Sequence, residues 1–250
     1  MPFQITGFDF GQSISFISRM VGHAVNIPDP AGSSDPAIVQ MATAVNVALG
    51  EMLTLAEWQD LTEKGSIPIV ADMAGQKEKA FDLPVDFYRF IDMTQWGKQT
   101  MLPALGPVSP QAWQMYVVRN YTPQLTLFWQ VRGDKLNVLN PPFPDPIDFE
   151  FFYLSRGQVI DQDDPTILKN VASKNGDKYK LDGALITLLA RVKYLEWKGF
   201  DSSATMRDFL NVFNSRAGAD KGAGALTLNR VVGIPLITPM ANLPVTGYGT

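Results

Sequence analysis

The chain has 250 residues, no cysteine, one histidine (His23) and a formal net charge of −4. The lack of cysteine excludes disulfide frameworks, thiolate metal sites and thiol nucleophiles, and a single imidazole excludes any site that needs two. Apolar runs fall short of the roughly 20 residues that cross a bilayer, and the first residues lack the basic and apolar regions of a signal peptide. We therefore expect no membrane association and few means of catalysis.

Helical patterns dominate the first quarter of the sequence. Apolar residues at helical spacing predict a short helix over residues 10–22. Asp35-Pro36 is a typical helix start, because Asp caps the free N–H groups and Pro fits the first helical position. A 3.6-residue apolar period then runs from Ile38 to Leu61 and predicts one long helix over residues 35–64.

Residues 66–155 are expected to form a β-rich insert, because prolines and aromatics are frequent there and the apolar period falls toward 2. Segments 67–70 and 79–83 suggest one hairpin, and segments 125–131 and 135–139 suggest a second. In the second hairpin, Arg132-Gly133-Asp134 is interpreted as the turn rather than as an adhesion motif. We expect a further strand over 148–154 and a short helix over 110–118.

Helical patterns return over residues 165–173, 182–198 and 202–217, each preceded by an Asp or Ser that can act as a cap. Residues 218–224 read as a small-residue hinge rather than a phosphate loop, since no strand precedes them and the GK[ST] ending is missing. The predicted fold class is α+β: a helical bundle of long helices with a β-rich insert and an extended C-terminal arm. Residues 1–224 would form a single domain, and residues 225–250 would form the arm.

The arm carries apolar groups but has no partner segment of its own, so we expect it to bind another chain. The candidate partner-binding residues are Val231, Val232, Ile234, Leu236, Ile237, Leu243 and Tyr248.

The sequence gives little support for a catalytic or metal-binding site. Asp161, Asp163 and Asp164 could bind a hard cation, but the Gly and Glu of an EF-hand loop are missing, so capping and loop solvation are favoured. His23 has no serine in a nucleophile context and is interpreted as a surface or capping residue. The aromatics near Trp129 and over 149–153 could stack on bases, although their alternation favours core packing. We expect no enzyme activity, no cofactor and no metal.

Charge is unevenly distributed along the chain. Residues 1–62 carry one base and six acids, residues 63–164 carry nine bases and thirteen acids, and residues 165–250 carry eleven bases and six acids. The three regions therefore have net charges of −5, −4 and +5. Opposite signs at the two ends can attract within one chain or between copies.

The order of several motifs resembles the head–tail adaptor (connector) proteins of tailed bacteriophages. The resemblance covers roughly residues 35–217. It rests on the helix 40–52 reaching Trp58, the stretch 81–91 with its Leu-Pro-x-Asp-Phe core, the residues 129–136, the segment 140–144, the strand ending in Tyr153, and the helix closing on 198–201.

The resemblance implies a structural virion protein that assembles in the host cytoplasm and resides in the phage neck. Its partners would be identical subunits in a ring of twelve, the portal protein, and a tail nozzle or tail-tube protein. DNA would pass through the lumen without specific binding, so lumen-facing residues should be acidic or neutral. The alternatives are a carboxylate-based polysaccharide or cell-wall hydrolase, and another virion subunit such as a head-completion or tail-tube protein.

Overall fold

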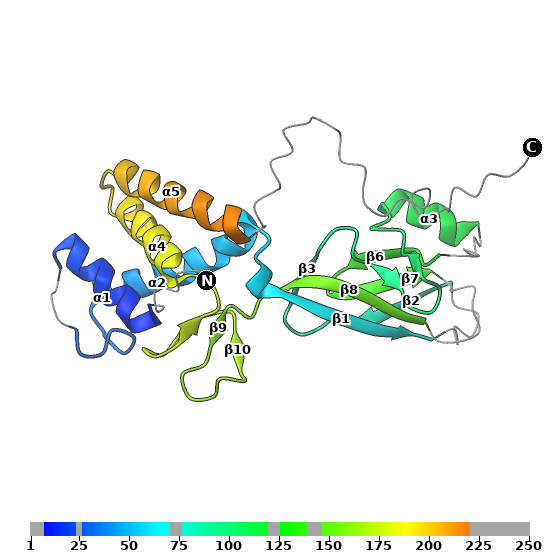
Figure 1. Cartoon of the computed structure of the whole chain (residues 1–250), viewed down its shortest axis with the longest axis horizontal. Helices are drawn as coiled ribbons and strands as arrows, with labels where there is room; N and C mark the ends of the chain where they lie inside the picture. The colour runs from blue at the N-terminus through cyan, green and yellow to red at the C-terminus, as the bar shows by residue number, and fades with distance from the viewer. Residues whose placement is uncertain (1–7, 24–26, 71–76, 120–125, 140–146, 221–250) are drawn as a thin grey trace, which may run out of the picture.

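The protein consists of a helical part and a β-rich part at opposite ends of its long axis (Figure 1). The computed structural model describes residues 8–23, 27–70, 77–119, 126–139 and 147–220. In these residues the helical part contains α1 (Phe10–Val21), α2 (Pro36–Leu55), α4 (Gly183–Trp197) and α5 (Ser203–Asp220). A short helix, α3 (Pro110–Val118), lies on the β-rich part.

Local capping explains where the helices begin. The Asp9 carboxylate accepts the backbone N–H of Gln12 at 2.7 Å and completes a capping box at the start of α1. Asp35 and Asp182 cap α2 and α4 in the same way, each accepting an N–H two residues later. These side chains satisfy backbone donors that a helix leaves unpaired in its first turn.

The helical core forms around α4, which packs against α1, α2 and α5. The inner face of α2 is fully buried at Met41, Val45, Leu49 and Met52, so its 3.6-residue period does match one packed face. Phe209 of α5 closes the other side of this core.

Two antiparallel sheets form the main β-rich part. In the first, β1 (Thr62–Ile69) pairs along its full length with β8 (Ile147–Ser155), from Thr62 opposite Leu154 to Ile69 opposite Ile147. The other edge of β8 pairs with β3 (Phe87–Phe90) and with β4 (Trp96–Gly97). β4 pairs in turn with β5 (Leu102–Pro103). The second sheet has the order β2 (Glu78–Asp82), β7 (Lys135–Leu139) and β6 (Trp129–Arg132).

An aromatic cluster fills the space between these two sheets. The Phe90 ring packs edge-on against Trp129 and Phe151, with ring centroids 4.8 and 4.9 Å apart. Phe149 is fully buried in the same cluster. Edge-to-face packing of this kind adds stability beyond the apolar area that it buries.

A third, small sheet lies beside the helices and contains β9 (Val159–Ile160), β10 (Leu168–Lys169) and β11 (Lys178–Tyr179). Its loops contact α1 and α2: the N–H of Gly11 donates to the Asn175 carbonyl, and the Asn46 side chain exchanges two hydrogen bonds with Ala172. These hydrogen bonds attach the small sheet to α1 and α2 and stabilise the helical part.

The predicted bundle of long helices is wrong. The described residues form five α-helices and eleven strands in three antiparallel sheets, and the fold is a mixed α+β arrangement in which only α2 reaches 20 residues. The helix expected over 35–64 ends at Leu55, where Ala56 turns to an extended conformation. Trp58 then folds back so that its indole N–H donates to the Met52 carbonyl at 2.8 Å, and β1 begins at Thr62.

Two other local predictions are also wrong. The helix expected over 165–173 is replaced by a turn and β10, because the Asp164 carboxylate binds both the N–H and the hydroxyl of Thr166 in an Asx turn. The strands expected to form a hairpin over 67–83 belong to different sheets, since β1 pairs with β8 and β2 pairs with β7.

Several elements match the sequence closely. The structure confirms the helices at α1, α3, α4 and α5, the β6–β7 hairpin and the strand at β8. Gly133 adopts a φ of 63° in the hairpin turn, which accounts for the Arg-Gly-Asp sequence as turn chemistry. The predicted arm, residues 225–250, lies outside the described residues.

Candidate interaction surfaces

The aspartates considered as a cation site form an ion-pair network with lysines instead. Asp161 pairs with Lys169 and Lys174, and Asp163 pairs with Lys174. The hydrogen bond from Lys169, followed by that from the Asp163 N–H, holds the pKa of Asp161 far below its ordinary value. The described part of the chain contains no group of three or more His, Asp or Glu side chains arranged to hold a metal.

Asp177 is the buried centre of this network, with a side chain that is 0% exposed. Its carboxylate accepts backbone N–H groups from Gln162, Ser173 and Lys174 and lies 3.5 Å from the Lys169 ammonium. Burial raises the pKa of Asp177, but these donors outweigh it and keep the pKa below its ordinary value. The network fixes the loops of the small sheet.

Ion pairs within the chain also use much of the basic charge of the C-terminal region. Lys193 of α4 pairs with Glu51 of α2 at 2.8 Å, and Lys180 pairs with Glu63 at 3.0 Å. These contacts join the basic C-terminal region to acids that precede it in sequence. Of these two pairs, Lys193–Glu51 joins the basic C-terminal region to the acidic N-terminal region, whereas Glu63 belongs to the middle region.

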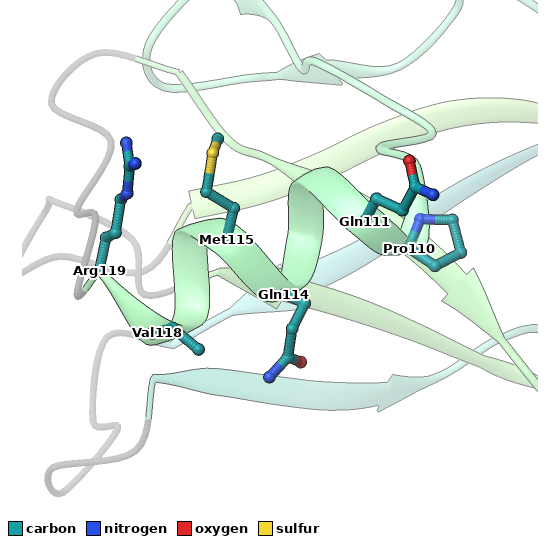
Figure 2. A pocket seen from close by; sticks show the side chains of 6 residues that line it. All are labelled: Pro110, Gln111, Gln114, Met115, Val118 and Arg119. Atoms are coloured by element: carbon teal, nitrogen blue, oxygen red, sulfur yellow. The ribbon is translucent and has the colours of Figure 1, made fainter.

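Two surface hollows are described, and neither has the carboxyl pair that glycoside hydrolysis requires. One, of about 600 Å³, follows the outer surface of α3, where Figure 2 shows Gln114 and Val118 on one side of the helix and Met115 and Arg119 on the other. The other, of about 620 Å³, lies between β3 and β6 and has Asp92 as its one lining acid.

Glu51, whose side chain is 39% exposed and pairs with Lys193, borders the outer face of α2, which is otherwise uncharged. Its exposed residues follow the 3- and 4-residue spacing of a helix-packing seam. They are Pro36, Gln40, Thr43, Val47, Gly50 and Thr54, with Val39 and Leu55 beside them. A Cβ added at Gly50 would meet no atom within 4 Å, so packing within the chain does not account for this mid-helix glycine. We call this surface the α2 face.

The second half of α5 has a similar outer surface, which we call the α5 face. Its exposed residues are uncharged: Leu210, Asn211, Asn214, Ser215, Gly218 and Ala219. A Cβ at Gly218 would also meet nothing within 4 Å. α2 and α5 both pack against α4 in the helical part (Figure 1). The sequence analysis missed both faces, although the spacing of uncharged residues over 36–54 is visible in the sequence.

Large apolar side chains are exposed at both ends of the molecule. Trp197 and Phe200, at the turn between α4 and α5, are 49% and 58% exposed. In the β-rich part, Met93 and Met101 are almost fully exposed and have φ values of 61° and 53°.

The structure separates the aromatics that could stack on bases. Trp129 and Phe151 are buried in the core, whereas Phe152 is 43% exposed on the outer face of the first sheet. His23 is exposed and its Nε2 lies 2.9 Å from the Asp35 carboxylate beside the start of α2, as expected for a surface histidine. The seven candidate partner-binding residues of the arm lie outside the described residues.

Within the described ranges, one helix, α2, is long and apolar enough to cross a membrane by length and composition alone. Its inner face is packed in the helical core, and a core helix passes the same test. This is weak evidence for a membrane span.

No protein-family model matches the chain, and the comparison with curated proteins gives no match.

Proposed function

We propose that the chain is a subunit of a head–tail adaptor ring in a tailed bacteriophage, joining the portal to the tail and continuing the DNA channel. The observation that carries the proposal is the pair of uncharged faces on α2 and α5. A closed ring of identical subunits needs two different surfaces, each complementary to the other, on different sides of the subunit. Two exposed faces on two different helices of the subunit support the proposal.

The lack of charge on both faces supports a packed interface. Interface cores are depleted of charged residues, because a buried charge requires a partner to offset its desolvation. The glycines at positions 50 and 218 allow close approach of a neighbouring helix. The ring would thus assemble through its helical parts.

The two ends of the molecule suit different partners. The exposed Trp197 and Phe200 lie at the helical end, and the exposed Met93 and Met101 lie on the β-rich part. A ring built through the helices would present one set to each neighbour along the phage axis. The portal and a tail nozzle or tail-tube protein are the partners that the proposal assigns to these ends, with the arm residues from Val231 to Tyr248 adding contacts to another chain.

The oligomeric mass of the purified protein, alone and with portal, tests the proposal. We expect rings of twelve by light scattering and electron microscopy, with a lumen that is acidic or neutral. Val47→Glu on the α2 face should abolish rings, whereas Val85→Glu, at a fully exposed position outside both faces, should leave them intact. A protein that stays monomeric with portal present, or six-fold rings, would contradict the proposal.

A further inference from the structure

The outer face of the first sheet carries two exposed aromatic rings. Trp96 of β4 lies directly opposite Glu150 of β8, and Phe152 lies two residues further along β8. Such diagonal neighbours on adjacent antiparallel strands share one face and lie roughly 7–8 Å apart. Trp96 and Phe152 are each 43% exposed. We call the surface formed by Trp96, Glu150 and Phe152, with Lys64 and Lys98 beside them, the β8 face.

Helix α3 packs on the second sheet rather than on the β8 face (Figure 1). There the Trp113 indole N–H donates to Glu78 of β2, and Tyr116 packs against Phe128 beside β6. An antiparallel sheet with one face in water normally carries polar residues on that face. Two neighbouring aromatic rings on the β8 face therefore indicate that this surface contacts a ligand.

The polar groups beside the two rings include hydrogen-bond donors and acceptors. The Glu150 carboxylate lies 2.9 Å from the Lys64 ammonium and 3.6 Å from the Lys98 ammonium. The hydrogen bond from Lys64 holds the pKa of Glu150 below its ordinary value, so Glu150 is an acceptor at neutral pH. Both lysine side chains are more than half exposed, and each ammonium has three N–H groups, so donors remain for a ligand. The hydroxyl of Ser66, opposite Glu150 on β1, adds a group that can donate or accept.

The charges of the β8 face disfavour two common classes of ligand. Nucleic-acid binding relies on Lys and Arg charges that neutralise phosphates, whereas Lys64 and Lys98 share Glu150 as their counter-charge. The core of a protein interface is depleted of charged residues, whereas Glu150 is the neighbour of both aromatic positions. A neutral ligand that has flat apolar faces and many hydroxyl groups fits both the rings and the charged groups.

We propose that the β8 face binds a neutral polysaccharide of β-linked pyranose units whose substituents are equatorial. Each such unit has a flat face of C–H groups, which is attracted by the negative face of an aromatic ring. Trp96 and Phe152 each stack against one sugar unit. The hydroxyl groups at the rim of the sugar donate to Glu150 and accept from Lys64 and Lys98. The sheet holds both rings in place before the ligand arrives, which lowers the entropy lost on binding.

Calorimetric titration of the full chain with cellohexaose and with chitohexaose, two soluble β-linked oligosaccharides, tests the proposal. Contacts with two half-exposed rings support a dissociation constant on the order of 1 mM for at least one of them. We expect Trp96→Ala and Phe152→Ala each to weaken binding at least about fivefold, because each removes one apolar contact. Trp197→Ala, at an exposed tryptophan of the helical part, is the matched control and should leave the affinity unchanged.

Trp96→Tyr covers the case in which an alanine variant folds poorly, because it keeps an aromatic ring and should keep most of the affinity. Absence of binding to both oligosaccharides, or an affinity that Trp96→Ala leaves unchanged, would overturn the proposal. Binding of oligothymidylate that weakens as salt rises would overturn it in favour of nucleic acid. A change of oligomeric mass in Trp96→Ala would overturn it in favour of a contact between subunits. Because the titration does not require ring assembly, the site and the ring can fail separately.

Discussion

The substitution Gly50→Ala separates the stability of the subunit from the stability of the proposed ring. Gly50 lies inside α2, is exposed, and would place a Cβ in open space. Glycine inside a helix destabilises it by roughly 0.5–1 kcal/mol relative to alanine. Gly50→Ala should therefore stabilise the separate subunit by that amount, which corresponds to a Tm increase of about 1–4 °C for a chain of this length.

The same methyl group should weaken the ring. If a neighbouring helix packs closely over Gly50, the added Cβ must be accommodated in a filled interface, which costs about 1–3 kcal/mol. We expect the concentration at which half of the rings dissociate to rise at least about fivefold, since 1 kcal/mol corresponds to that factor. Gly218→Ala, on the α5 face, should likewise stabilise the separate subunit and weaken the ring.

Thermal unfolding of dilute subunit measures the first effect, and light scattering over a dilution series measures the second. Gln114→Ala on the exposed surface of α3 serves as the control and should not change ring dissociation. A higher Tm together with unchanged or tighter rings would refute the α2 face as a ring contact. A lower Tm would refute the argument that the position is free of contacts within the chain.

Three further outcomes are expected. Asp177→Asn should destabilise the subunit by about 3 kcal/mol or more in urea unfolding at pH 7, because it leaves Lys169 with less compensation in a buried network. Since the pKa of Asp177 is lowered by folding, its contribution is present at neutral pH and is lost as the pH falls below about 4, so wild type and variant should converge in acid. Gly65→Ala should cost about 1–3 kcal/mol in the same assay, because the new Cβ would lie 2.5 Å from the Phe151 ring. Deletion of residues 231–250 should leave the circular dichroism spectrum and Tm unchanged but weaken docking to the portal or neighbouring subunits in co-sedimentation, and equal docking would contradict the role given to the arm.

The elements that could be predicted from the sequence are those whose signals are local. Asp35-Pro36 marks the start of α2, and Gly133 marks the β6–β7 turn, because caps and turns depend on residues a few positions apart. The start of α4 after Asp182 follows the same logic. None of these requires knowledge of the rest of the fold.

Contacts between distant segments determined what the sequence did not reveal. The pairing of β1 with β8 joins residues about 80 to 90 positions apart, and no local signal distinguishes it from the hairpin expected over 67–83. The end of α2 was misplaced for a related reason. Trp58 and Leu61 continue the apolar period because they return to the same core after the chain has left the helix.

Charged residues of the helical part form ion pairs within the subunit, whereas most residues on the outer faces of α2 and α5 are uncharged. The sequence suggested that opposite charges at the chain ends could attract within one chain or between copies, and Lys193 of the basic end is paired with Glu51 of the acidic end inside the subunit. The one charge that borders the α2 face, on Glu51, is already paired with Lys193. An assembly through such faces depends on apolar burial and close packing, so salt should affect it little, whereas an assembly through charged ends would dissociate as salt rises.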